Sequence, residues 1–249
     1  MRAPSSEDTL NSMIDQKQAR MFTSMPAVIT GVNLDSMSVN VQPAINELYS
    51  DGEVEEFPEI LSVPLIMPGS RKALVSFPVE VGDTVMLIFA QRSMDNFKLG
   101  NGRPTQPNDY RKHDMQDAIA IPGLFTFGNS ANKPSSRKWS HNTKDVVIVA
   151  NIGGNEAEIR IAESGDITMN TEFKVNVNAK DINLTATNAI AIKAASMSIE
   201  VPTTTWLGDY SQTGNYDLTG EATFNGIAFS THRHTGVTPG SGTSAGPIA

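Results

Sequence analysis

Hydrophobic and polar residues alternate in short runs between residues 25 and 97. Five stretches have the two-residue period of a strand that buries one face. Turn-forming sequences separate them, among them Asp51-Gly52, Pro68-Gly69 and Val81-Gly82-Asp83. Several short strands within one small region favour a closed barrel of the OB type. The predicted strands are Ala27–Gly31, Ser38–Val41, Ile60–Ile66, Ala73–Phe77 and Thr84–Phe89.

The segments on either side of this region lack the alternation. Residues 5–20 are polar, and Ser5 and Asp8 have the spacing of a capping box, which favours a short helix or a loose arm. Residues 98–150 are rich in Pro, Gly and Asn, which predicts irregular chain up to a strand at Asp145–Val149. The predicted order therefore begins with an N-terminal arm at 1–20, an OB-fold domain at 21–110 and a connector at 111–144.

A different pattern begins at Glu158, where pairs of apolar residues two positions apart recur every seven or eight residues. Small or polar residues stand between the members of each pair, and turn formers link the units. Each unit therefore holds one short strand with one apolar face. The pairs are Ile159/Ile161, Ile167/Met169, Val175/Val177, Ile182/Leu184, Ile190/Ile192 and Met197/Ile199.

One strand per unit cannot enclose a core, because a single-chain β-helix needs roughly 20 or more residues per coil. Three chains wound about a common axis contribute about 24 residues per layer and can form a triangular prism. Such a prism has free sheet edges only at its ends. A β-sandwich is the alternative, since its turns recur every 8–12 residues or so. We therefore predict an all-β chain whose residues 145–230 form a trimeric, intertwined β-helix.

The chain continues into two histidines and a segment rich in Gly, Ser, Thr and Pro. His232 and His234 are two positions apart, so on a strand both imidazoles project from the same face and Arg233 points the other way. Two imidazoles alone make a poor metal site. Around a threefold axis six of them form two stacked triangles, an octahedral set that suits Fe or Ni better than Zn. Residues 231–249 are therefore predicted to be a metal-bound apex.

Composition narrows the classes of function. Charged residues make up 18% of the 249 residues and the net charge is −8, which argues against binding to a nucleic-acid backbone. The absence of cysteine excludes disulfides, thiol catalysis and zinc–thiolate sites. The first 20 residues lack the apolar run of a signal peptide, so we expect a soluble product made without a leader.

The order of barrel, connector, repeat and terminal motif resembles the central spike proteins of contractile bacteriophage tails. The likeness is most specific at Thr231–Gly236 and Gly240–Pro247, which read T-H-x-H-T-G and G-x-G-x-S-x-G-P. The resemblance implies a homotrimer at the tip of the virion baseplate, whose OB-fold ring binds a tail hub or tube protein. It also implies one iron ion per trimer on the threefold axis, held by His232 and His234 of each chain.

The function implied by this resemblance is mechanical. The spike would pierce the host outer membrane during tail contraction, without catalytic residues or an organic cofactor. Some relatives carry a lysozyme domain between barrel and prism, but residues 111–150 are too few to hold one. We therefore expect that the chain is not an enzyme.

Two alternatives stay open, a capsule-degrading tailspike and a receptor-binding adhesin. A depolymerase needs paired carboxylates in a groove, and an adhesin displays aromatic side chains at a tip. The aromatic residues that precede the apex are expected in the core or in the prism wall: Trp206, Tyr210 and Tyr216. The acidic residues beside the first repeats are expected on a solvated face: Glu156, Glu158, Glu163 and Asp166.

Overall fold

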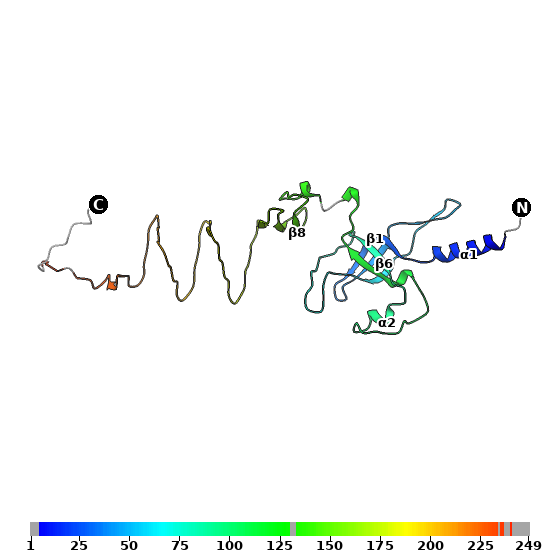
Figure 1. Ribbon diagram of the computed structural model, residues 1–249, viewed down its shortest axis with the longest axis horizontal. Coiled ribbons are helices and arrows are strands. Elements are labelled where there is room, and N and C mark those ends of the chain that lie inside the picture. The colour runs from blue at the N-terminus through cyan, green and yellow to red at the C-terminus, as the bar shows by residue number, and fades with distance from the viewer. Residues whose placement is uncertain (1–4, 130–132, 234, 237–239, 241–249) are drawn as a thin grey trace. The chain divides into compact units, whose positions relative to one another are not determined.

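The computed structural model describes residues 5–129, 133–233, 235–236 and 240. Its regular elements are mostly β-strands, with few helices (Figure 1), and this confirms the prediction of an all-β chain. The chain divides into two compact units, Met1–Asn178 and Ala179–Ala249.

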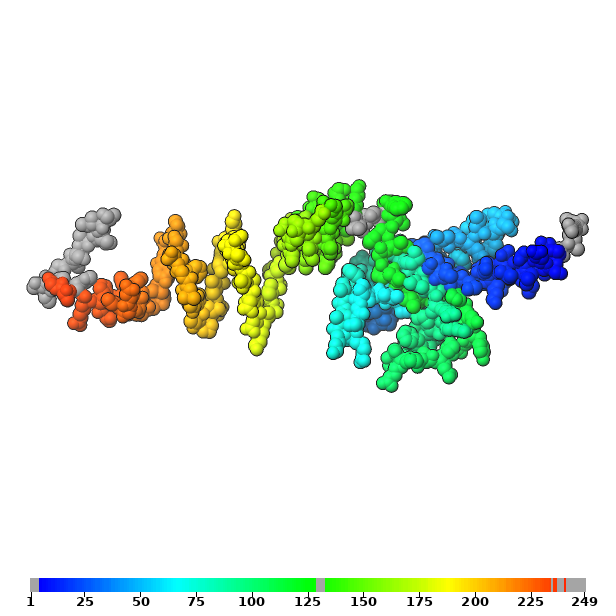
Figure 2. Space-filling view, viewed as in Figure 1, coloured from blue at the N-terminus to red at the C-terminus, as the bar shows by residue number. Residues whose placement is uncertain are grey.

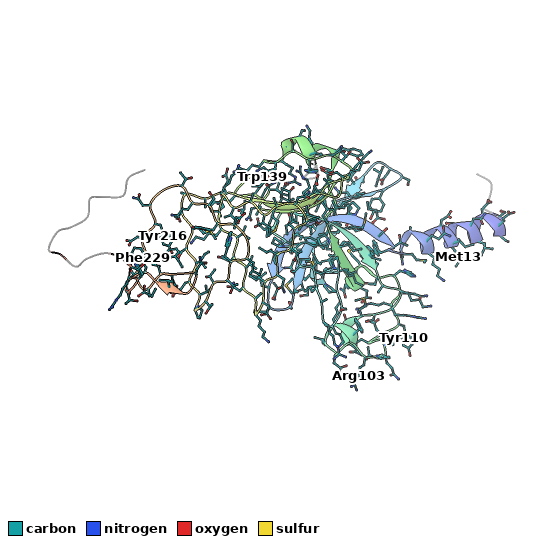
Figure 3. The ribbon with its side chains drawn as sticks, turned by 60° about the vertical axis from the view of Figure 1, so that its left-hand side comes forward. Met13, Arg103, Tyr110, Trp139, Tyr216 and Phe229 are labelled. Carbon is teal, nitrogen blue, oxygen red and sulfur yellow. The ribbon has the colours of Figure 1, made fainter. Side chains whose placement is uncertain are left out.

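The first element is a helix, α1 (Ser6–Ala19), and it begins where the sequence predicts it. The Ser5 hydroxyl accepts a hydrogen bond from the Asp8 N–H at 3.1 Å, and the Asp8 carboxylate accepts one from the Ser5 N–H at 2.9 Å. This capping box gives hydrogen-bond acceptors to two backbone N–H groups that have no partner within the first turn of the helix. None of the residues of α1 is buried, and Met13 projects into solvent (Figure 3).

A curled half-barrel sheet of five strands follows, in the order β5-β2-β1-β6-β7. Neighbouring strands are antiparallel throughout. An isolated parallel bridge between Leu65 and Ala120 brings the two outer strands together at one point. The strands are β1 (Ser24–Asn33), β2 (Ser38–Pro43), β5 (Ile60–Pro64), β6 (Thr84–Phe89) and β7 (Ala118–Pro122).

Alternate side chains of these strands form the core. In β6, Val85, Leu87 and Phe89 are buried, and the residues between them are not. Each large aliphatic or aromatic side chain buried in this way stabilises the fold by roughly 1.5–3 kcal/mol before entropy is subtracted. The core consists of Ala27, Ile29, Val39, Val41, Ile60, Val63, Val85, Leu87, Phe89, Ala118 and Ala120.

Four of the five strands predicted for this region are confirmed, and the strand predicted at Ala73–Phe77 is wrong. This stretch lies in a tight loop. In it the Ser70 N–H donates to the Ala73 carbonyl, and the Val75 N–H donates to the Pro68 carbonyl. The fifth strand of the sheet is instead β7. It lies inside residues 111–144, where we expected an irregular connector.

Short elements occupy the connections around this sheet. A small hairpin joins β2 to β5. A one-turn helix and a 3-10 turn lie between β6 and β7, and a second 3-10 turn follows β7. A further 3-10 turn precedes the next sheet. These elements are β3 (Glu47–Leu48), β4 (Val54–Glu55), α2 (Asp95–Lys98) and the turns Met115–Asp117, Phe127–Asn129 and Pro134–Ser136.

A second, separate sheet holds the first two apolar pairs of the repeat. It is antiparallel, in the order β10-β9-β8, and consists of β8 (Val146–Ala150), β9 (Ala157–Ile161) and β10 (Ile167–Thr171). Its register aligns Val146 with Ile161 and Ile167 in one row across the strands. The predicted strand at Asp145–Val149 is confirmed within one residue at each end.

The remaining repeats lie in extended chain that has no strand partner between Phe173 and Glu221. The segment coloured yellow to orange turns back and forth as a single width of chain (Figures 1 and 2). A short hairpin of β11 (Thr223–Phe224) and β12 (Ile227–Ala228) follows it. The predicted triangular prism needs three chains, and it therefore stays a prediction at this point.

Candidate functional site

His232, one of the two predicted metal ligands, lies just beyond the β11–β12 hairpin and is exposed. Its Nδ1 is 2.6 Å from the carbonyl oxygen of Phe229, and the two rings lie 5.5 Å apart between centroids. A carbonyl oxygen can only accept a hydrogen bond, so Nδ1 carries the proton and the neutral ring has its lone pair on Nε2. Ligating histidines commonly have this arrangement.

The second predicted ligand, His234, lies outside the described residues. Within the part of the chain that the structure describes, no group of three or more His, Cys, Asp or Glu side chains is placed to hold a metal ion. A single copy therefore contributes at most a fraction of a ligand set. The metal site stays a prediction that depends on several chains meeting at the apex.

The most unusual surface is one face of the β8–β10 sheet. Six aliphatic side chains from three strands form two rows of three on this face, and they are 41–70% exposed. We call this surface the open apolar face. Its residues are Val146, Ile161 and Ile167 in the first row and Ile148, Ile159 and Met169 in the second.

The opposite face of the same sheet carries more polar residues, and these are covered by the chain itself. Glu158 is only 4% exposed and accepts a hydrogen bond from Asn170 Nδ2 at 2.8 Å. Arg160 Nη1 donates to the Ser140 carbonyl at 3.2 Å, which places the segment before β8 against this face. For a single chain this is the reverse of the usual arrangement, since the polar face of the sheet is covered and its apolar face is exposed to solvent.

The same segment corrects one expectation from the sequence. Glu156 and Glu158 were expected on a solvated face, but both are buried. Glu156 accepts hydrogen bonds from the Gly153 and Lys138 N–H groups, both at 2.9 Å, and these bonds hold the pKa of its carboxyl below the usual range. We call the segment before β8, which covers this face, the covering segment. The Glu156 side chain links it to the turn after β8.

A partly buried ion cluster holds the long connection between β6 and β7 in place. Arg111 Nε lies 2.7 Å from Asp117 Oδ2, and its two Nη atoms lie 2.8 Å from Asp95 and Asp109. Asp117 is fully buried and also accepts from the Met94 N–H at 2.8 Å. Burial alone would raise the pKa of the Asp117 carboxyl, but the hydrogen bonds from Arg111 and Met94 outweigh it and the pKa is lowered.

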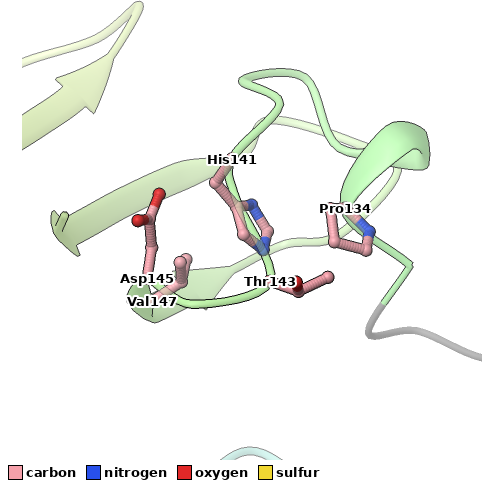
Figure 4. A pocket seen from close by; sticks show the side chains of 5 residues that line it. All are labelled: Pro134, His141, Thr143, Asp145 and Val147. Carbon is pink, nitrogen blue, oxygen red and sulfur yellow. The ribbon is translucent and has the colours of Figure 1, made fainter. Parts of the chain in front are cut away.

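A small open hollow lies beside the covering segment (Figure 4). Its volume is about 230 Å³, which is less than the roughly 300–1,000 Å³ of typical small-molecule sites. Nδ1 of His141 is buried there without a hydrogen-bond partner among the described residues. The hollow is lined by Pro134, His141, Thr143, Asp145 and Val147.

The sequence predicted the apolar pairs of this face in β9 and β10, but not that the strand β8 would extend the face. The alternation in Val146–Ala150 continues in the pairs Ile159/Ile161 and Ile167/Met169, and antiparallel pairing aligns all three. Only the register, which depends on turn geometry, brings these side chains onto one face.

These features define a modular, all-β protein with a self-contained sheet domain and a region whose apolar side chains are not covered by any of the described residues. Residues 25–123 match the family model of the phage protein Gp138 N-terminal domain. The match spans nearly all of the curled sheet, from β1 to the residue after β7.

This similarity to a bacteriophage protein domain is consistent with the phage baseplate and spike family that the terminal motif resembles. A phage structural domain of this kind suggests a location in the virion. No curated protein matches the chain. No helix in the described ranges is both long and apolar enough to cross a membrane.

Proposed function

We propose that this protein is the central spike at the tip of a contractile phage tail, a homotrimer that punctures the host outer membrane when the tail contracts. The observation that carries the proposal is the open apolar face of the β8–β10 sheet. The phage domain at residues 25–123 supports the assignment to a virion component. The remaining support comes from burial and hydrogen bonding along the repeat.

A stable sheet does not leave six aliphatic side chains in water while it covers its polar face. Burying each of them stabilises a fold by roughly 1.5–3 kcal/mol, and three copies would bury three such faces together. The face is self-complementary, because it is apolar across both rows and carries no charge. Other copies of the same chain are therefore the partner that fits it best.

The backbone of the later repeats also indicates pairing with other chains. Between Phe173 and Glu221 the chain forms no backbone-to-backbone hydrogen bond, although its conformation is extended. The apolar pairs from Val175 to Ile199 are 56–73% exposed. Extended chain with unpaired N–H and C=O groups is a template for pairing with other strands. In an intertwined trimer the neighbouring chains supply both the hydrogen bonds and the apolar partners.

Three copies suit the length of the repeat better than two. Each unit has one strand and one turn, so each copy supplies one wall of the shaft. Two walls leave both edges open, whereas three walls close a prism around one apolar axis. The absence of cysteine is compatible with such a shaft, because inter-chain burial then takes the place of disulfides.

The curled sheet supports the role of an attachment domain. Its order and the parallel bridge between Leu65 and Ala120 give a ring in which the first strand pairs with the second and fourth and the third meets the fifth. This connectivity supports the proposed five-stranded OB-type barrel. In the proposed assembly, three such barrels form a ring that binds a hub or tube protein of the tail.

The apex of the proposed spike holds one iron ion on the threefold axis, with His232 and His234 of each chain as ligands. The protonation of Nδ1 on His232 fits this role, because it leaves Nε2 as the donor nitrogen. A bound ion would clamp the three chain ends together, where strands would otherwise fray. The proposed spike works mechanically, and no catalytic step is assigned to its residues.

Solution mass and metal content test the proposal together. Light scattering on the purified full-length protein should give three times the 26.8 kDa mass of the chain, with one transition-metal ion per three chains. A monomer would contradict the proposed assembly, and a trimer without bound metal would contradict the iron apex. Saturable binding to bacterial cells or release of sugar from capsule would favour the adhesin or the depolymerase instead.

A further inference from the structure

The chain just before His232 folds into a compact hairpin of its own. The turn between β11 and β12 is Asn225-Gly226, with φ values of 50° and 80°. Two consecutive residues with positive φ make a type I′ turn, and Asn-Gly is its preferred sequence because glycine tolerates this conformation without strain. The Phe229 N–H donates to the Ala222 carbonyl at 2.7 Å and continues the pairing below the turn.

A carboxylate closes the open end of this hairpin. One oxygen of Glu221 accepts a hydrogen bond from the Ser230 N–H at 3.0 Å, and the other accepts from the Ser230 hydroxyl. The rings of Phe224 and Phe229 add an edge-on contact across the two strands, with centroids 6.4 Å apart. Two hydrogen bonds to one ionised side chain are stronger than two neutral ones.

The closed hairpin ends directly beneath the imidazole of His232. Phe229 contributes both the carbonyl that accepts from Nδ1 and the ring that packs against the imidazole. The position of that carbonyl is set by the hairpin, since residues 229 and 230 are the ones held by Ala222 and Glu221. The hairpin therefore supplies the carbonyl to which Nδ1 donates and the ring that packs against the imidazole.

We propose that Glu221 is a positioning residue that, through the hairpin of residues 221–230, holds His232 with Nε2 presented to the metal of the apex. This inference rests on the proposed function for the metal itself. Its physical content is preorganisation, because the single chain fixes the ligand nitrogen before three copies meet. The hydrogen bond that a ligating histidine donates to its outer partner, here the Phe229 carbonyl, typically changes metal affinity by about 10–100-fold, and Glu221 acts by placing that carbonyl.

The experiment uses the full-length protein labelled with ¹⁵N in its histidine side chains. In the metal-free wild type, the His232 ring should show a protonated Nδ1 and an unprotonated Nε2, with the signals assigned from a His232→Gln variant. Glu221→Ala and Gly226→Ala should lose this single tautomer. Gly226→Ala acts through the turn, where a Cβ at φ +80° is strained. Glu200→Ala, which removes an exposed carboxylate at the end of the repeat, is the matched control.

Affinity for Ni²⁺, measured by calorimetry on the same proteins, gives the second readout. Glu221→Ala should weaken Ni²⁺ binding by about 10–100-fold. Glu221→Gln keeps an oxygen acceptor and should recover part of the loss, whereas Glu200→Ala should bind as the wild type does. Light scattering on each variant checks that the assembly is unchanged.

The two levels of the argument fail in different ways. If the wild type binds no metal, the proposed apex is wrong, and the tautomer still reports whether the hairpin orients His232. If the wild type binds Ni²⁺ and both hairpin variants bind it equally well with an unchanged tautomer, the positioning role of Glu221 is overturned.

Discussion

The curled sheet and the repeat region use similar residues in opposite ways. Between Ala27 and Ala120 alternate Val, Ile and Leu side chains point into one interior and are buried within the chain. From Val146 to Ile199 an equally regular alternation leaves its aliphatic side chains in solvent. Among the described residues, none of the hydrophobic side chains beyond Ala120 is buried.

The difference comes from how many other strands of the same chain pack against each strand. In the curled sheet five strands close on one another, so every inward side chain meets partners from the same copy. In the repeat region the turns return after seven or eight residues, and among the described residues nothing covers the apolar side of the strands. The first region buries its core within one chain, whereas in the proposed spike the second would fold only by association. Stability and assembly should therefore respond to different mutations.

The largest effect should follow a charge on the open apolar face. Ile159→Asp would place an unpaired carboxylate in the seam between copies three times per trimer, at a cost of several kcal/mol each. We expect a monomer by light scattering, with the curled sheet still protected in hydrogen exchange. Ile152→Asp makes the same chemical change in the turn after β8, off this face, and should leave the trimer intact. A trimeric Ile159→Asp protein would contradict the proposed interface.

A change inside the curled-sheet domain should lower the stability of that domain without affecting assembly. Arg111→Met leaves the buried Asp117 carboxylate without its cation, which typically costs about 3–5 kcal/mol. Hydrogen exchange of peptides from β1 and β6 in urea should show this loss, while the mass of the assembly stays the same. The exposed Arg103 offers a matched control, because Arg103→Met removes a charge with no buried partner (Figure 3).

The same ion cluster predicts an acid dependence of moderate size. The pKa of Asp117 is lowered in the folded protein, so its contribution is fully present above its unfolded pKa of about 4. The contribution is lost as the pH falls below 4 towards the folded pKa. Asp117→Asn should be less stable than the wild type at pH 7, and the difference should shrink on acidification. A difference that is constant from pH 7 to pH 2 would show that the carboxylate charge does not matter.

The smallest effect on assembly is expected at the apex. His232→Ala combined with His234→Ala should abolish metal binding, which elemental analysis measures, but the protein should remain trimeric. The reason is that in the proposed trimer the aliphatic repeats would supply most of the buried area, while one ion would join the chains only at the apex. Dissociation of this double variant would mean that metal, and not apolar burial, holds the copies together.

Local signals in the sequence predicted much of the sheet domain. The Ser5–Asp8 capping box and the alternation in Thr84–Phe89 act within a few residues, and both were confirmed. The strand β7 was missed because its buried residues are the small Ala118 and Ala120, and because it lies in Pro- and Gly-rich sequence. Its place in the sheet comes from tertiary pairing with β6, which no local pattern reports.

The predictions for the repeat region divide in the same way. Period and strand character could be predicted from the sequence, since both depend on neighbouring residues. The burial of Glu156 and Glu158 could not, because the covering segment comes from residues before β8. Of the two histidines, only His232 lies among the described residues. In the proposed role, its orientation depends on the hydrogen bond between Ser230 and Glu221, which lies nine positions earlier in the sequence.

Hydrogen exchange of the segment from Phe173 to Val201, measured against protein concentration, tests the central claim most directly. We expect slow exchange in the trimer and loss of that protection on dilution to the monomer, while peptides from β1 and β6 stay protected throughout. Protection that persists in a monomer would show that each copy closes its own core there, and this would contradict folding by association.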